Sequence, residues 1–325
     1  MKKTNKTITA LLIIFTFLVT IFTYNTTAIQ ISQKNNTITV DKHGNGDYTT
    51  IKEAITNSPE GSTIYIKNGE YPEILEIKKL IYLIGEGKDA AIINPISQKN
   101  KYAVNLGAPG IKISSLSITN GAPGLYTSAI RITACDTEIK NCNIYNTPVG
   151  ISIWSSNNKI DNCNFYNCKD EGIALLGSDY YECNSNTITN CEFYENGDGI
   201  ELKQSSYNTI SNCEFYKNTH AGIDAISSNN KNTITNCKIY NNKQYGIYLS
   251  SSSENQIIDC EIKNNKYGDL VENGESKNND IITKYDLLEN PSKQKTTISI
   301  IQNLLSKIYK IKNSKILTLL GLDNF

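Results

Sequence analysis

Apolar and polar residues alternate over short stretches in the second half of the chain, as in Ile223-Asp224-Ala225 and Cys213-Glu214-Phe215. A period of two is typical of β-strands that bury one face. Each stretch is three to five residues long, and Ser, Asn and Lys separate it from the next. We therefore expect many short strands from about residue 129 onward.

Two sequence marks recur together along this region. A Gly-Ile pair begins at Gly150, Gly172, Gly199, Gly222 and Gly246, at intervals of 22, 27, 23 and 24 residues. An Asn-Cys or Asp-Cys pair ends at Cys142, Cys163, Cys191, Cys213, Cys237 and Cys260, at intervals of 21, 28, 22, 24 and 23 residues. A repeat of this length with three short strands corresponds to one coil of a parallel β-helix. The pattern predicts an all-β fold, a single-stranded right-handed parallel β-helix.

The residue before each of these Cys marks a bend between two strands. Asn tolerates the left-handed backbone conformation that a sharp bend requires, and stacked Asn amides can hydrogen-bond from coil to coil. The six Cys that follow the bends are expected to point inward as a column of small buried side chains. Cys135, Cys168 and Cys183 lie off this column, and a disulfide among them cannot be assigned.

The β-helix is expected to span residues 36–284, with less regular coils before residue 129. Thr50-Ile-Lys-Glu53 matches a capping box and predicts a short helix, Thr50–Asn57, over the first coil. Such a cap protects the open end of a stacked solenoid from pairing with other chains. Strand candidates in this half are Thr63–Ile66, Ile74–Ile77, Leu80–Leu83, Ala91–Ile93, Ile111–Ile113 and Leu116–Ile118.

Both ends of the chain depart from the repeat. Residues 1–28 combine a basic start with an apolar stretch, Leu11 to Phe22, which predicts a signal peptide or, alternatively, an uncleaved anchor. Either places the protein outside the cytoplasm, secreted or at the cell surface. Residues 285–325 form a tail with an amphipathic helix, Thr297–Ile311, that either covers the far end of the β-helix or attaches the chain to the cell surface.

The net charge is zero, with 32 basic and 32 acidic side chains. This balance gives no electrostatic reason to expect nucleic acid as a partner. A monomer is expected.

Ile38-Thr-Val-Asp-Lys-His-Gly-Asn-Gly-Asp-Tyr-Thr-Thr-Ile-Lys-Glu-Ala-Ile55 resembles the start of pectin-methylesterase and pectate-lyase-like β-helix proteins. The Gly-Ile units resemble the repeats of polysaccharide lyases and epimerases, and of accessory β-helix proteins of nitrous oxide reductase. The resemblance implies a polysaccharide partner. Pectin methylesterases carry two Asp, each seven residues after a strand Cys. Asp170 matches this spacing, whereas Val149 stands at the other position.

By the same resemblance, the Gly-Ile strands form the floor of a substrate groove. Alternation then places one outward side chain of each coil in a column, and neighbours in it lie about 4.8 Å apart. The column contains Arg131, Ser152, Ala174, Glu201, Asp224 and Tyr248. Because Glu201 and Asp224 are adjacent carboxylates, one pKa should rise or a cation should bind.

The predicted catalytic residues are Glu201, Asp224, Lys203, His220, Asp198 and Asp170. The carboxylate pair could hydrolyse a glycoside by acid–base catalysis. Alternatively, Asp198, Glu201 and Asp224 could hold Ca²⁺ against a uronate while Lys203 or His220 removes the C5 proton, as in a lyase or epimerase. The simplest alternative is a solvated charged face without chemistry.

A second outward column consists of Tyr145, Tyr166, Tyr194, Tyr216 and Tyr240. Sugar rings pack on aromatic faces, so this ladder either binds polysaccharide or only stabilises the stack. The predicted substrate-binding residues are Arg131, Trp154, Tyr248, Tyr166, Tyr194 and Tyr216.

Three functions remain open from the sequence. The first is a secreted lyase or epimerase on uronate-containing glycan, with hydrolase or pectin methylesterase activity less favoured. The second is a non-catalytic, adhesin-like surface protein. The third is an accessory protein of an exported metalloenzyme, for which His43 and His220 are the only two histidines available.

Overall fold

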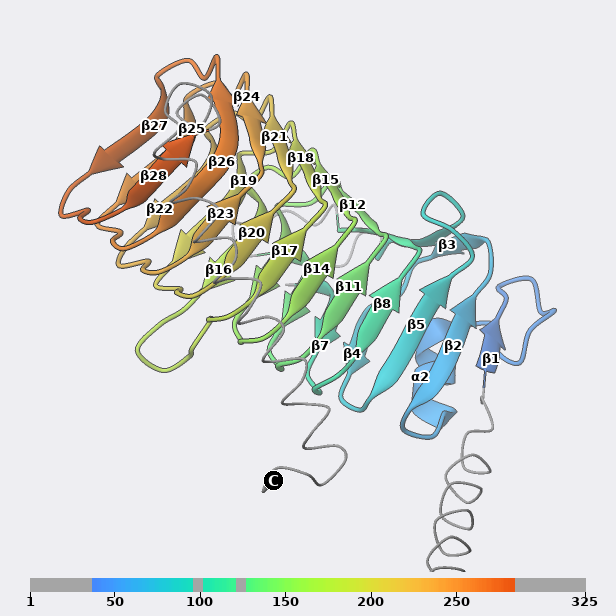
Figure 1. The fold of residues 1–325 in the computed structure, drawn as a ribbon. Helices are drawn as coiled ribbons and strands as arrows, with labels where there is room; N and C mark the ends of the chain where they lie inside the picture. Colours follow the sequence, from blue (N-terminus) through green and yellow to red (C-terminus); the bar gives the residue numbers. More distant parts are fainter. Residues whose placement is uncertain (1–36, 96–101, 121–126, 284–325) are drawn as a thin grey trace, which may run out of the picture. The chain divides into compact units, whose positions relative to one another are not determined.

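The computed structural model describes residues 37–95, 102–120 and 127–283. Within them the chain winds as a right-handed parallel β-helix, in which every coil stacks on the one before (Figure 1). The predicted fold class is therefore confirmed for these residues. The predicted signal peptide and the predicted C-terminal helix lie outside the described residues. No helix in the described part of the chain has the length and apolar character needed to cross a bilayer.

One strand of each coil belongs to a nine-stranded parallel sheet, which we call the Gly-Ile sheet. Its strands are β4 (Leu75–Ile77), β7 (Tyr102–Leu106), β10 (Ser128–Ile132), β13 (Val149–Ile153), β16 (Glu171–Leu176), β19 (Asp198–Lys203), β22 (Ala221–Ile226), β25 (Tyr245–Ser250) and β27 (Gly268–Asn273).

The remaining strands form two further parallel ladders. The ladder that follows the Gly-Ile sheet along each coil consists of β2 (Ser62–Ile66), β5 (Ile81–Gly85), β8 (Lys112–Ser114), β11 (Glu138–Lys140), β14 (Lys159–Asp161), β17 (Thr187–Thr189), β20 (Thr209–Ser211), β23 (Thr233–Thr235), β26 (Gln256–Lys263) and β28 (Asp280–Thr283). The third, which we call the Tyr ladder sheet, consists of β3 (Gly69–Tyr71), β6 (Ala91–Ile93), β9 (Ser117–Thr119), β12 (Asn143–Tyr145), β15 (Asn164–Tyr166), β18 (Glu192–Tyr194), β21 (Glu214–Tyr216) and β24 (Lys238–Tyr240).

The first coils differ from the prediction mainly at element bounds. The six strand candidates correspond to β2, β4, β5, β6, β8 and β9, shifted by one or two residues at their ends. Three strands were not predicted: β1 (Thr37–Val40), β3 and β7. β3 and β7 lack regular alternation, whereas the alternating Thr37-Ile38-Thr39-Val40 of β1 was overlooked.

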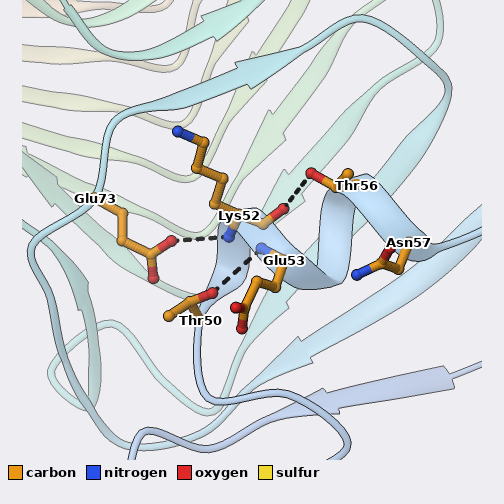
Figure 2. A pocket seen from close by; sticks show the side chains of 6 residues that line it. All are labelled: Thr50, Lys52, Glu53, Thr56, Asn57 and Glu73. Atoms are coloured by element: carbon orange, nitrogen blue, oxygen red, sulfur yellow. Dashed lines mark hydrogen bonds between the residues drawn. The ribbon is translucent and has the colours of Figure 1, made fainter.

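The predicted capping helix is present as α2 (Ile51–Asn57), at the β1 end of the stack (Figure 1). Its N-cap Thr50 accepts a hydrogen bond from the Glu53 backbone, as the capping box requires (Figure 2). The Glu73 carboxylate accepts two further helix N–H groups, those of Ile51 and Lys52, at 2.9 and 2.8 Å. The first turn of the helix is therefore tied to the second coil.

The Asn-Cys marks behave as predicted. All six bend residues, Asn141, Asn162, Asn190, Asn212, Asn236 and Asp259, have φ between 53 and 56°. The six Cys that follow them are buried and carry free thiols. Beside them Phe165, Phe193 and Phe215 stack with ring centroids 4.8 Å apart. The interior therefore contains columns of like side chains, which run over several successive coils.

The Gly-Ile glycines have a steric reason. A Cβ on Gly199 would lie 2.4 Å from the carbonyl oxygen of Gly222, and one on Gly150 would lie 2.2 Å from that of Gly172. Two coils can approach this closely only without a side chain at this position. Gly therefore recurs at this position because of the close contact between coils, and not because a turn requires it.

Two buried Asn ladders were not predicted. The first contains Asn158, Asn186, Asn208, Asn232, Asn255 and Asn279, and the second contains Asn196, Asn218, Asn242 and Asn265. In both ladders each side-chain oxygen accepts the backbone N–H and the side-chain N–H of the Asn one coil earlier. The amides thereby satisfy buried turn backbone and fix the register of successive coils.

Asn232→Ala should destabilise the β-helix by roughly 3 kcal/mol, because it leaves the buried backbone and side-chain N–H groups of Asn208 without their acceptor. Asn232→Asp keeps that acceptor and should cost less. The free energy of unfolding in urea measures both. The exposed Asn45→Ala is the control. A loss below about 0.5 kcal/mol for Asn232→Ala, the range of ordinary surface changes, would contradict the role of the ladder.

Candidate functional site

The outward column of the Gly-Ile sheet has the predicted register. Arg131 pairs with Ser152, Ser152 with Ala174, Ala174 with Glu201, Glu201 with Asp224, and Asp224 with Tyr248. The column continues beyond the predicted residues, to Asn105 and Glu76 at one end and Val271 at the other. Side chains about two dozen residues apart in sequence are thus nearest neighbours on this face.

Three side chains converge at the ends of β19 and β22. The Oδ1 atom of Asp198 accepts the Ala221 backbone N–H at 2.7 Å and lies 2.8 Å from Nδ1 of His220. The same imidazole nitrogen is 3.6 Å from Oδ2 of Asp224. The other carboxylate oxygen of Asp224, Oδ1, is buried and has no hydrogen-bond partner among the described residues. We call Asp198, His220 and Asp224 the Asp-His-Asp cluster.

Further carboxylates surround this cluster. Glu171 pairs in register with Asp198 and is buried, and Asp170 precedes it at the turn into β16. Glu201 lies beside Asp224 and is half-buried. Asp170 was predicted as a catalytic residue, but nothing in the sequence indicates that the neighbouring Glu171 is almost excluded from water.

Burial and mutual repulsion shift the proton affinities of these acids. Burial, followed by the charges of Asp170, Glu201 and Asp198, raises the pKa of Glu171 to about 9. Burial and the charge of Asp198 raise the pKa of Asp224 to about 7. Burial also raises the pKa of Glu201 and of Asp170. Glu171 therefore retains its proton at neutral pH.

The pKa of His220 shifts in the opposite direction from that of a histidine whose burial favours the neutral form. Its hydrogen bond to Asp198, assisted by the charges of Asp198, Asp224 and Glu201, raises the pKa of the imidazole. The ring of Tyr245 packs edge-on against it with centroids 5.8 Å apart. Tyr245 was not predicted as a site residue, although it immediately precedes a Gly-Ile pair and therefore enters the sheet at the position that Asp198 occupies two strands earlier.

Lys203 lies on the other side of Glu201. It is exposed at the end of β19, in register with Leu176 and Ile226 of the adjacent strands. Its positive charge and that of His220 both act to lower the pKa of Glu201. The six predicted catalytic residues therefore belong to three neighbouring coils of one sheet.

The predicted substrate-binding residues divide into two places. Arg131, Trp154 and Tyr248 belong to the Gly-Ile sheet or its edge. The guanidinium of Arg131 lies 6.0 Å from the ring centroid of Tyr102. Trp154 meets the exposed Tyr181 edge-on at 6.4 Å, a contact that sequence alone could not reveal because Tyr181 lies in an irregular loop.

Tyr166, Tyr194 and Tyr216 lie on the Tyr ladder sheet, apart from the acidic cluster. Successive rings from Tyr145 to Tyr240 stack with centroids 5.0–5.5 Å apart and planes within 10° of parallel. Each inner ring therefore has both faces covered by its neighbours. Because sugars pack on ring faces, this geometry favours the stabilising role over sugar binding for the three inner rings.

The predicted calcium set was Asp198, Glu201 and Asp224. The donor atoms that lie within 4.8 Å of one another belong instead to Asp198, His220 and Asp224. Ca²⁺ is bound by six to eight oxygen ligands, whereas this group offers two carboxylates and one imidazole. The compact group therefore fits Ca²⁺ poorly, and calcium binding through Glu201 stays a prediction.

Comparisons with known proteins agree with the geometry of the coils. The family described as right handed beta helix region matches residues 128–283, and the pectinesterase family matches residues 37–144. The structure resembles that of pectate lyase Pel9A with a TM-score of 0.55 at 13% identity, over 74% of this chain and 78% of that one. The two family matches and this structural likeness support a right-handed β-helix fold of the pectate-lyase-like kind.

Another solved structure with similar coils is the A-module of the mannuronan C-5 epimerase AlgE4 from Azotobacter vinelandii. Its TM-score is 0.50 at 16% identity, over 68% of this chain and 75% of that one. Tailspike protein 2 of an Escherichia coli bacteriophage has a TM-score of 0.56 at 14% identity, over 69% of this chain and 35% of that one. At such identities the likeness concerns the fold alone.

In sequence, the chain is similar to pectinesterase/pectinesterase inhibitor 18 from Arabidopsis thaliana. It is 33% identical over 123 residues, which are 33% of this chain and 22% of that protein. The chain thus covers about a fifth of the length of this relative. Moreover, the pectinesterase match ends at residue 144, before every residue of the Asp-His-Asp cluster.

Glu171→Gln should stabilise the protein above neutral pH. The pKa of Glu171 is raised from about 4.3 in an unfolded chain to about 9, so its stabilising contribution is greatest at low pH and is lost as pH rises through this window. The variant should therefore raise the melting temperature more at pH 8 than at pH 5. The difference should be several degrees, which corresponds to a change in the free energy of unfolding on the order of 1–3 kcal/mol. Equal gains at both pH values, or a similar effect of the exposed Glu60→Gln, would contradict this assignment.

Proposed function

We propose that this protein acts outside the cytoplasm on a uronate-containing polysaccharide, by a lyase-like or epimerase-like reaction on the Gly-Ile sheet. The observation that carries the proposal is the grouping of Asp198, His220, Asp224, Glu201 and Lys203 on two adjacent strands, β19 and β22, and the turn that enters β22. The predicted signal peptide supports export. The similar folds of a pectate lyase and a mannuronan epimerase support the substrate class.

Both reactions begin with removal of the proton on C5, next to the uronate carboxylate. This step needs a base near C5 and positive charge near the carboxylate, because the charge that develops there must be stabilised. Lys203 and His220 lie on opposite sides of Glu201 and are the two groups suited to proton transfer. Since Nδ1 of His220 is engaged by Asp198, its Nε2 is the nitrogen left to exchange a proton.

The negative charge of the site sets a condition on the binding of a uronate. A uronate would meet Glu201, Asp224 and Asp198, so its carboxylate would be repelled unless protons or a cation reduce their charge. The raised pKa of Glu171 and of Asp224 already removes part of that charge near neutral pH. Arg131 lies three strand spacings from Glu201, about 14 Å along the column, where it suits a second uronate of the same chain.

Pectin methylesterase activity has less support. The match to that family covers the first coils only, and Val149, at the position where the family has its other Asp, is a buried residue of β13. The esterase pair of carboxylates is therefore incomplete.

Incubation with polyuronates in D₂O tests the proposal directly. Deuterium incorporation at C5 reports the epimerase, which returns a proton to C5, whereas unsaturated products report the lyase, which leaves C5 without hydrogen. Lys203→Ala and His220→Gln should each lower the rate about 100-fold or more if the residue transfers the proton. Lys231→Ala and His43→Gln, which change the same residue types elsewhere on the surface, should leave it unchanged.

Absence of both C5 exchange and unsaturated products across a panel of polyuronates, with a folded protein, would refute the catalytic proposal. Retention of those glycans on the inactive protein would then favour the adhesin-like function.

The aromatic residues separate glycan binding from stability. Trp154→Ala should weaken retention on a uronate glycan matrix at least several-fold, because Trp154 and the exposed Tyr181 are not covered by a stack. Tyr194→Ala should instead lower the free energy of unfolding by about 1–3 kcal/mol, since it removes two ring contacts, and leave retention unchanged. The reverse pattern would restore the Tyr ladder as a sugar-binding surface.

A further inference from the structure

We infer that Asp198, His220 and Asp224 form a site for one divalent transition-metal ion of the Mn²⁺ or Zn²⁺ class, because their donor atoms converge from two adjacent coils onto one point. The donor atoms all lie within 4.8 Å of one another. Neither the position of this point nor the need for His220 depends on catalysis, and only the role of the ion toward a uronate rests on the proposed function.

The distances suit one shared ion. Two ligands bound to the same Zn²⁺ or Mn²⁺ at about 2.1 Å lie roughly 3.0–3.5 Å apart. Nδ1 of His220 is 2.8 Å from Oδ1 of Asp198 and 3.6 Å from Oδ2 of Asp224. Replacing the hydrogen bond between His220 and Asp198 by two metal bonds therefore requires shifts of well under 1 Å.

A second, independent observation concerns the other carboxylate oxygen of Asp224. Asp224 is only 6% exposed, and its Oδ1 atom has no hydrogen-bond partner among the described residues. An unpaired carboxylate oxygen inside a protein costs roughly 1–3 kcal/mol or more, so natural structures rarely leave one without a role. A bound cation would give this oxygen a partner and would offset the negative charge of the carboxylates around it.

The donor set selects the class of metal. Imidazole nitrogen suits Zn²⁺ and Mn²⁺ better than Ca²⁺, which prefers an all-oxygen shell. The two ligands that flank the ion are also held in place. The Ala221 N–H fixes Oδ1 of Asp198, and Tyr245 packs edge-on against the His220 ring. Such outer contacts orient metal ligands in known sites.

Three protein ligands leave coordination positions open. Structural zinc sites are closed by four protein ligands, whereas sites that bind substrate keep a position for water or for a ligand oxygen. Here Glu201, the register neighbour of Asp224, is the nearest further carboxylate of the column. An ion at this point would offset the charge of the acids and offer the open position to an anionic sugar.

The test uses the full chain after treatment with a chelator, titrated with Mn²⁺ and followed by paramagnetic resonance. Mn²⁺ is chosen because it avoids thiolates, and the exposed Cys135 thiol could otherwise bind Zn²⁺. We expect one bound Mn²⁺ per chain. His220→Gln and Asp224→Asn should each weaken binding at least tenfold, while the matched His43→Gln and Asp136→Asn should not.

Co²⁺ provides a second readout that does not depend on the stability of the Asp224 variant. Wild-type protein should give a visible Co²⁺ spectrum without thiolate charge transfer, and His220→Gln should abolish it. Equal binding by wild type and His220→Gln, a thiolate band, or tighter binding of Ca²⁺ than of Mn²⁺ would each overturn the inference.

The two proposals fail separately. One equivalent of Mn²⁺ with neither C5 exchange nor unsaturated products on any polyuronate would refute the catalytic function and leave the metal site standing. C5 exchange that persists in chelator, in a protein that binds no Mn²⁺, would refute the metal site and leave the function standing.

Discussion

The structure depends on the register between successive coils. Parallel pairing places residues about 4.8 Å apart along the stack, but strand pairing alone tolerates slippage. The buried amides of the two Asn ladders remove that freedom, because each accepts two N–H groups from the coil before and would lose both if the coil shifted. Phe193 stacked on Phe165, and Ile200 beside Ile173, follow from the same register.

The same register creates the electrostatic problem of the Gly-Ile sheet. Stacking that brings Ile200 onto Ile223 also brings Glu201 beside Asp224. Hydrophobic side chains gain from this repetition, whereas carboxylates lose, since each adjacent charge and each lost water opposes ionisation. The acids therefore hold protons, pair with His220 or bind a cation. Proton retention by Glu171, pairing of His220 with Asp198 and the open Asp224 oxygen are three responses to one constraint.

The sequence could predict the features that recur in every coil, but not which turn residues the coils bury. Gly-Ile and Asn-Cys pairs set the coil length, the inward Cys column and the outward order from Arg131 to Tyr248. The buried Asn ladders were missed although Asn208 and Asn232 recur two residues before an inward Ile, because Asn in a turn is ordinarily solvated and only coordinates reveal its burial. For the same reason the depth of Glu171 and the partner of Trp154 were not predictable. Both depend on irregular turns, whose path the period does not specify.

A solenoid also separates the residues that fold it from those that can act. Inward positions of the Gly-Ile sheet hardly change from coil to coil, with Ile173, Ile200, Ile223 and Ile247 in one buried column. The outward positions beside them change completely, from Ala174 to Glu201, Asp224 and Tyr248. A change at an outward position leaves the core packing intact, so chemistry can be placed on any coil without loss of fold. Likeness of coils to an esterase, a lyase or an epimerase therefore says little about the reaction, and the activity of this chain has to be sought in its outward column and in His220 at the turn beside it.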